Sequence, residues 1–94
     1  MTSHTSVHVL IRGRVQGVGY RAWTAARARE LKLTGFVRNR RDGAVEAVFG
    51  GEAPAVQKML ELCREGPLGA RVTAVETVGK GVSAFAAFEV LPTV

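Results

Sequence analysis

The chain has few of the residues on which many catalytic and structural sites depend. In 94 residues it contains one cysteine, Cys63, one aspartate, Asp42, and two histidines, His4 and His8. A single cysteine cannot form an internal disulfide, so cysteine usage does not point to an oxidising compartment. These residues are also too few for a metal-binding cluster, and we expect neither a metal nor another cofactor.

Long apolar runs are missing as well. None approaches the ~20 residues of a membrane-spanning helix, and residues 1–6 have neither the charged nor the apolar region of a signal peptide. We therefore expect a cytoplasmic protein with no membrane partner, in which residues 1–6 are flexible.

The overall composition is that of a small folded protein. Apolar residues make up 47 % of the chain and charged residues 22 %, as in ordinary globular domains. We find no repeat or linker and expect one domain over residues 1–94, acting as a monomer. The net charge of +5 favours an anionic partner, which could be nucleic acid, a lipid surface or a phosphorylated small molecule.

Glycine and proline divide the chain into segments whose apolar residues repeat with the period of a strand or of a helix. The predicted strands cover residues 7–13, 36–39, 44–49, 71–78 and 85–91, and the predicted helices cover residues 20–33 and 54–65. This order, βαββαβ with a short terminal strand, is that of the ferredoxin-like sandwich. We expect an α+β fold with an antiparallel sheet of four to five strands and both helices on one face.

This topology brings two distant segments together. A right-handed crossover makes the first two strands parallel and places the third strand between them. The loop 13–19 and Asn39 then lie at the same edge of the sheet. Two strand spacings separate them, so their backbones are about 9 to 10 Å apart in space. That distance leaves room for a bound phosphate and an attacking water.

The segment Gly13-Arg14-Val15-Gln16-Gly17-Val18-Gly19-Tyr20-Arg21 joins a strand to the start of a helix. Its three glycines allow a tight turn whose N–H groups point inward, and the helix start adds partial positive charge, so the loop is suited to an anion. Arg21 lies in the first turn of that helix, where a positive charge is unfavourable beside the positive helix end. A dianion bound in the loop would compensate for both positive charges. The alternative, a solvated surface arginine, stays open, as does an ordinary turn-favouring role for Asn39.

The sequence gives little support for catalysis by an aspartate, a cysteine or a serine. Asp42 lies in a turn beside Gly43, where aspartate is common, and Cys63 lies on the apolar stripe of the second helix. The serines Ser3, Ser6 and Ser83 lack the context of a nucleophile. Three arginines beside Asn39 could steer an anionic substrate or could form a solvated basic hairpin; these are Arg38, Arg40 and Arg41.

Two segments resemble the signatures of the acylphosphatase family. Residues Gly13 to Arg21 resemble the motif G-x-V-Q-G-V-x-F-R, in which Met can replace Phe. Residues Gly35-Phe36-Val37-Arg38-Asn39, followed by Gly43, Val45 and Gly51, resemble the second motif of that family. The likeness extends over nearly the whole chain, and the fold of the family is the ferredoxin-like one.

The resemblance implies a hydrolase that acts on acid anhydrides and needs no metal. Its substrate would be an acyl phosphate, either a small molecule or a phosphorylated carboxylate of a protein, and its products a carboxylate and inorganic phosphate. Arg21 and the backbone N–H groups of Val15, Gln16, Gly17, Val18, Gly19 and Tyr20 would bind the phosphate. Asn39 would position water for in-line attack on phosphorus.

Two residues depart from the family pattern. Tyr20 stands where Phe or Met is usual, so its hydroxyl needs a partner. Lys32 stands where Gly is frequent. If Lys32 closes the first helix in the left-handed conformation, it costs roughly 1 kcal/mol of stability.

Two other functions share this topology. An RNA-binding module of the RRM type has the same element order, but residues 44–49 carry a single Phe and an acidic residue where that module needs several aromatic residues. We therefore expect no nucleic-acid partner. A non-catalytic regulatory domain is the second alternative, although both residues implied in catalysis are present.

Overall fold

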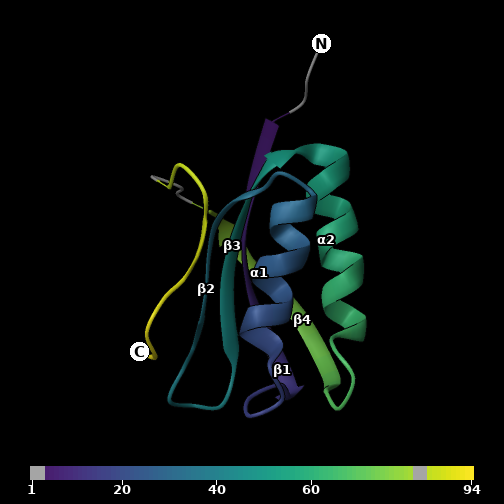
Figure 1. Cartoon of the computed structure of the whole chain (residues 1–94), viewed down its shortest axis with the longest axis vertical. Coiled ribbons are helices and arrows are strands. Elements are labelled where there is room, and N and C mark those ends of the chain that lie inside the picture. The colour runs from purple at the N-terminus through teal and green to yellow at the C-terminus, as the bar shows by residue number, and fades with distance from the viewer. Residues whose placement is uncertain (1–3, 82–84) are drawn as a thin grey trace.

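The computed structural model describes residues 4–81 and 85–94. Five strands and two helices follow one another along the chain (Figure 1). They are β1 (His4–Arg14), α1 (Tyr20–Glu30), β2 (Thr34–Asn39), β3 (Val45–Glu52), α2 (Ala53–Glu65), β4 (Arg71–Lys80) and β5 (Phe88–Val90). The element order is the predicted βαββαβ with a short terminal strand.

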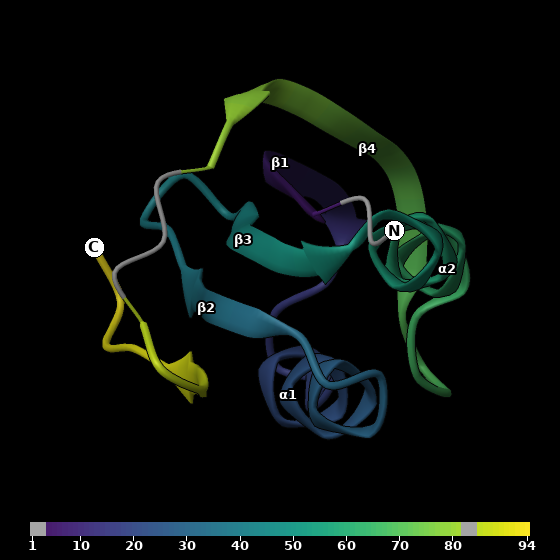
Figure 2. The ribbon, with the colours of Figure 1, turned by 90° about the horizontal axis from the view of Figure 1, so that it is seen from above.

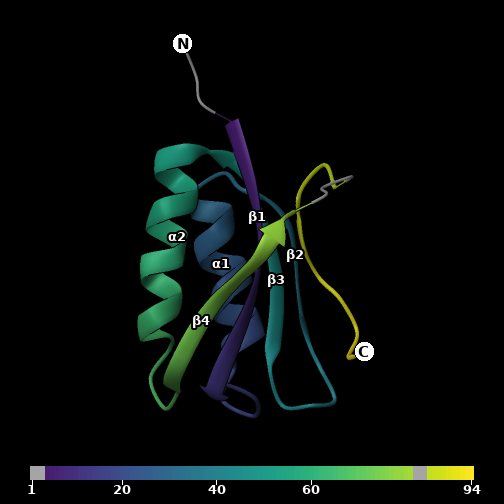
Figure 3. The ribbon, with the colours of Figure 1, turned by 180° about the vertical axis from the view of Figure 1, so that it is seen from behind.

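The strands form one sheet in the order β4-β1-β3-β2-β5. Strand β3 pairs antiparallel with both β1 and β2, so the predicted central position of this strand is confirmed. Both helices pack on one face, and the opposite face is free of helices (Figures 2 and 3). This is the α+β, ferredoxin-like arrangement expected from the sequence.

One feature of the predicted sheet is wrong. Strand β5 pairs with β2 in parallel, with Gly35 opposite Phe88, so the sheet is mixed and not purely antiparallel. The physical reason is the direction of the preceding strand. Because β4 is antiparallel to β1, and β1 runs in the same direction as β2, a chain that reverses after β4 reaches the free edge of β2 parallel to it.

The core lies between the sheet and the helices. The inward face of β1 and β3 supplies fully buried residues such as Val9, Ile11 and Phe49, and the Phe49 ring stacks on Phe88 of β5 at 5.5 Å between centroids. Helix α1 buries Tyr20, Thr24, Ala25 and Ala28, and α2 buries Val56, Met59 and Cys63. The apolar stripes read from the sequence therefore face the sheet, and Cys63 belongs to the core.

The ends of several elements differ from the prediction. Strand β1 begins at His4, inside the segment expected to be flexible, whose residues 1–3 lie outside the described residues. Helix α1 ends at Glu30 instead of Leu33. Strand β4 continues through Gly79 to Lys80, and β5 is only three residues long. Backbone pairing with a neighbouring strand extends the first and fourth strands past the point where their sequence pattern stops.

The helix-free face of the sheet holds a charged cluster formed by His8, Arg38 and Glu46. Glu46 is only 5 % exposed, and Arg38 Nε donates to its Oε1 at 2.7 Å. His8 Nε2 lies 2.6 Å from Glu46 Oε2. Burial raises the pKa of Glu46, but the hydrogen bonds from Arg38 and His8 outweigh this and hold the pKa below its usual range. Arg38 thus pairs with Glu46 on the face away from the helices.

Helix α1 ends in a left-handed residue, as considered from the sequence. Lys32 has a φ of 59°, and the N–H groups of Lys32 and Leu33 donate to the carbonyls of Arg29 and Ala28. This is the Schellman pattern, in which Gly is favoured because it has no Cβ.

We expect Lys32→Gly to be more stable than Lys32→Ala by roughly 0.5–1 kcal/mol, because only the glycine variant relieves the left-handed strain. Both variants lose the lysine charge, so their difference isolates the backbone conformation. Urea unfolding measures it. Equal stabilities would contradict this account of the helix end.

Candidate active site

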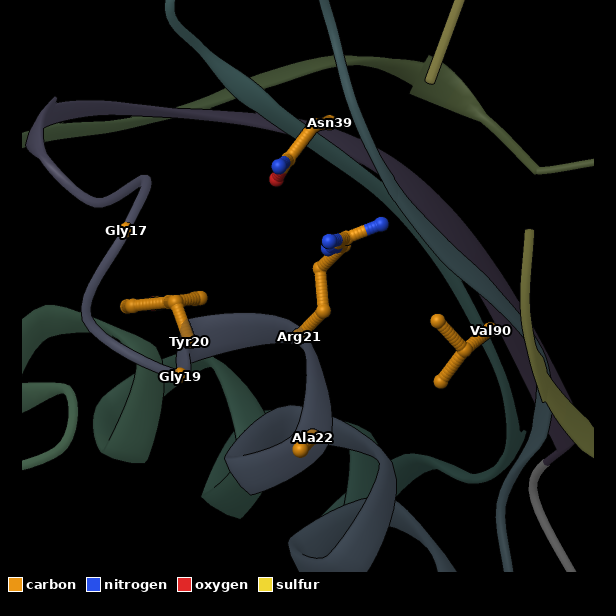
Figure 4. A pocket seen from close by; sticks show the side chains of 7 residues that line it. All are labelled: Gly17, Gly19, Tyr20, Arg21, Ala22, Asn39 and Val90. Carbon is orange, nitrogen blue, oxygen red and sulfur yellow. The ribbon is translucent and has the colours of Figure 1, made fainter. Parts of the chain in front are cut away.

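A pocket of about 300 Å³ opens at the end of the sheet where β2 ends and α1 begins. It takes residues from the β1–α1 loop, the first turn of α1, the last residue of β2, and β5. The residues that line it are Gly17, Gly19, Tyr20, Arg21, Ala22, Asn39 and Val90. The topology therefore brings the glycine loop and Asn39 to one cavity, as expected (Figure 4).

The loop between β1 and α1 presents its backbone to this pocket. Gly17 and Gly19 have φ angles of 77° and 76°, a backbone conformation that residues with a Cβ rarely adopt. Within the described part of the chain, no N–H group of residues 15–19 donates to another backbone group. These N–H groups, and those of the first turn of α1, are available to an anion.

Arg21 lies in the first turn of α1, and its guanidinium points into the pocket toward the side chain of Asn39 (Figure 4). Helix α1 has no acidic residue in that turn. Among residues 4–81 and 85–94, no carboxylate lies within ion-pair distance of Arg21. The cation therefore adds to the positive end of the helix, and the pocket is electropositive.

Asn39 is the last residue of β2, opposite Val45 of β3. Its backbone carbonyl accepts a hydrogen bond from Val94 N–H at 3.0 Å, which ties this end of β2 to the C-terminal segment. The side-chain oxygen Oδ1 is buried and has no hydrogen-bond partner among the described residues. A buried acceptor without a partner costs free energy. The Asn39 side chain points toward the pocket (Figure 4), where its amide can donate to a water molecule or accept from it.

Comparison with known proteins agrees with this geometry. The acylphosphatase family model matches residues 7–90. The chain belongs to the acylphosphatase family. An acylphosphatase of Azorhizobium caulinodans is 58 % identical over 74 residues, which cover 79 % of this chain and 78 % of that protein. An acylphosphatase of a Synechococcus strain is 49 % identical over 94 residues and covers the full length of both chains.

A solved structure gives the same result. The acylphosphatase of Coxiella burnetii superimposes with a TM-score of 0.88 at 38 % identity, covering 94 % of this chain and 93 % of that one. The comparisons name acylphosphatases, and they do not favour the RNA-binding or the purely regulatory alternative.

The loop residues implied by the acylphosphatase signature divide into two groups. Gly17, Gly19 and Tyr20 line the pocket together with Arg21 and Asn39. The side chains of the other three loop residues turn elsewhere. Val15 is 1 % exposed and belongs to the core, Val18 packs against the core, and Gln16 donates to carbonyls of the β2–β3 turn.

The hydroxyl of Tyr20 makes a hydrogen bond within the protein. The side chain is 1 % exposed, and the hydroxyl donates to the Cys63 carbonyl near the end of α2 at 2.7 Å. Burial and the neighbouring Cys63 raise the pKa of Tyr20, so this phenol stays protonated. This departure from the acylphosphatase pattern therefore links the start of α1 to α2 without leaving a buried polar atom unpaired.

Two pocket residues were missed in the sequence. Ala22 follows Arg21 in α1, and Val90 comes from β5 and is 45 % exposed. The sequence predicts a short terminal strand over residues 85–91 but does not predict the edge of the sheet to which it adds. Val90 reaches the pocket because β5 pairs with β2.

The basic hairpin next to Asn39 is largely neutralised. Arg38 pairs with Glu46, and Arg40 Nε donates to Asp42 at 3.3 Å. Asp42 also accepts from Ala44 N–H at 3.0 Å, and this bond and the Arg40 contact hold the pKa of Asp42 below its usual range. Asp42 therefore stabilises the turn and does not line the pocket. Of the three arginines, Arg41 alone forms no ion pair within the described residues.

Residues 4–81 and 85–94 contain no group of three or more His, Cys, Asp or Glu side chains placed to share a metal ion. None of their helices is long and apolar enough to cross a bilayer.

Proposed function

We propose that this chain hydrolyses acyl phosphates to a carboxylate and inorganic phosphate. In this proposal the N–H groups of residues 15–20 and the guanidinium of Arg21 bind the phosphate. Asn39 holds a water molecule for in-line attack on phosphorus. The observation that carries the proposal is the common pocket of the glycine loop, Arg21 and Asn39 in a chain of the acylphosphatase family.

The proposed reaction does not require an acidic or basic side chain. The water forms a bond to phosphorus while the bond from phosphorus to the acyl oxygen breaks, and the electron pair leaves with the carboxylate. Because a carboxylic acid has a pKa of about 4, this leaving group needs no general acid. The proton of the attacking water passes to a phosphate oxygen. The contribution of the protein is position and positive charge.

The amide of Asn39 is suited to the water. The amide can both donate to and accept from a water molecule, and so can hold it with a lone pair of the water oxygen toward the phosphorus. The supporting observation is that the Asn39 side chain lines the pocket beside Arg21 (Figure 4). Arg21 would meanwhile bind two phosphate oxygens with its planar guanidinium.

The proposal extends to a single-domain, monomeric enzyme in the cytoplasm. Small acyl phosphates and protein-bound acyl phosphates fit the same reaction.

A leaving-group comparison tests the function. We expect the protein, in excess EDTA, to hydrolyse benzoyl phosphate with a kcat of about 1–10³ s⁻¹. Phenyl phosphate, whose leaving group has a pKa of about 10, should react at least about 100-fold more slowly because no acid protonates it. Release of inorganic phosphate measures both rates. Equal rates for the two substrates, or activity that disappears in EDTA, would contradict the proposal.

A further inference from the structure

The side chain of Gln16 bridges the two halves of the pocket without entering it. Its Nε2 donates to the carbonyl of Arg40 at 2.7 Å and to the carbonyl of Ala44 at 2.9 Å. Gln16 belongs to the glycine loop, and residues 40–44 form the turn that follows Asn39 directly. Both protons of one amide are thus used between the loop and the hairpin.

The two acceptors are the carbonyls that also close the turn. Arg40 N–H donates to the Ala44 carbonyl at 2.8 Å, and Gly43 N–H donates to the Arg40 carbonyl at 3.1 Å. Gln16 therefore adds a second donor to each of two carbonyls that already have one. The turn is folded by its own hydrogen bonds, and the amide of Gln16 fixes where the folded turn lies relative to the loop.

Strand pairing fixes that relation only up to Ile11, which lies opposite Val45 of the hairpin. The N–H groups of residues 15–19 make no backbone hydrogen bonds in the described part of the chain, so backbone pairing does not hold the loop against the hairpin. Val15, which is 1 % exposed, anchors one end of the loop in the core. Beyond it, the Gln16 amide makes the only hydrogen bonds between residues 15–19 and residues 40–44 of the described chain.

We propose that Gln16 is a positioning residue that sets the distance between the phosphate held by the loop and the water held by Asn39. The inference rests on the proposed function. In-line attack requires the reacting atoms to be about 3–3.5 Å apart, and a displacement of 1 Å can cost about 100-fold in rate. The loop with Arg21 holds one reactant, and the strand end with Asn39 holds the other.

The test variant is Gln16→Met, which keeps the length of the side chain but removes both donors. Each turn carbonyl retains its backbone donor, so the variant is expected to fold. We expect kcat for benzoyl phosphate to fall about 10- to 100-fold. The inhibition constant of inorganic phosphate should change less than about 3-fold, because the loop and Arg21 stay together.

Arg29→Met is the matched control, because it also removes side-chain hydrogen bonds to a backbone carbonyl, here that of Phe88 at 3.0 and 3.3 Å. Its kcat should stay near that of the wild type. Gln16→Asn supplies a second test variant. It keeps an amide but is one methylene too short to reach both carbonyls, and its kcat should fall as in Gln16→Met.

A double-mutant cycle with Asn39→Ala separates positioning from general damage. If Gln16 acts through the alignment with Asn39, Gln16→Met should lower kcat by less than about 3-fold once Asn39 is already Ala. The full loss of kcat in the Asn39→Ala background would overturn the inference. So would a wild-type kcat of either Gln16 variant, or a loss of phosphate affinity with kcat unchanged. Each of these results leaves wild-type benzoyl phosphate hydrolysis, and hence the proposed function, intact.

Discussion

Replacement of Asn39 by Ala is expected to reduce kcat for benzoyl phosphate by about 100-fold or more. The substitution removes the amide that would orient the water, and it leaves the loop and Arg21 to bind the phosphate. The KM and the inhibition constant of inorganic phosphate should therefore change only modestly, by less than about 3-fold. Steady-state kinetics and competitive inhibition by phosphate measure the two effects separately.

Gln57→Ala is a suitable control for Asn39→Ala, because it removes an amide from the exposed side of α2. Its kcat should equal that of the wild type. Asn39→Ala also removes a buried acceptor that lacks a protein partner, so the variant should lose little stability. A variant that is well folded and turns over substrate at the wild-type rate would remove Asn39 from the proposed mechanism.

The position of this site followed from the sequence because it depends on topology. The alternation of residues 7–13 and the apolar stripe of the second helix each indicate one element with one buried face, and the turn at residues 40–43 makes residues 36–39 and 44–49 a hairpin. Once the order βαββαβ is known, handedness puts β3 between β1 and β2, and Asn39 must end beside the glycine loop. Topology alone therefore brings Arg21 and Asn39 to one pocket, without information about side-chain packing.

The features of the site that could not be predicted from the sequence depend on contacts made by single elements. Val90 lines the pocket only because the short strand β5 adds to the free edge of β2, and three residues carry too weak a pattern to specify an edge. The pairing of Arg38 with Glu46 needed the cross-strand register. The hydrogen bonds of the Gln16 amide could not be predicted because they depend on the conformation of the loop, which no periodic pattern describes.

Replacement of Arg21 by Ala is expected to weaken both binding and catalysis. Charge-assisted hydrogen bonds contribute about 1.5–3 kcal/mol each, so the inhibition constant of inorganic phosphate should rise by at least about 10-fold. The value of kcat/KM should fall by about 1000-fold, because the guanidinium also stabilises the charge that develops in the transition state. Lys58→Ala, which removes one positive charge from the exposed side of α2, should leave both quantities unchanged.

Arg21→Lys separates charge from geometry at the same position. Lysine keeps the positive charge but cannot bind two phosphate oxygens at once, so it should recover phosphate affinity better than kcat.

In the wild type, the Arg21 guanidinium lies at the positive end of α1, with no acidic residue in the first turn and no carboxylate in ion-pair distance among the described residues. Such a placement is unfavourable in the free protein and becomes favourable when a phosphate binds. Arg21→Ala should therefore leave the free protein at least as stable as the wild type while losing the stabilisation that added phosphate gives, and thermal unfolding with and without phosphate measures both. If phosphate raises the Tm of Arg21→Ala as much as that of the wild type, Arg21 does not bind the phosphate.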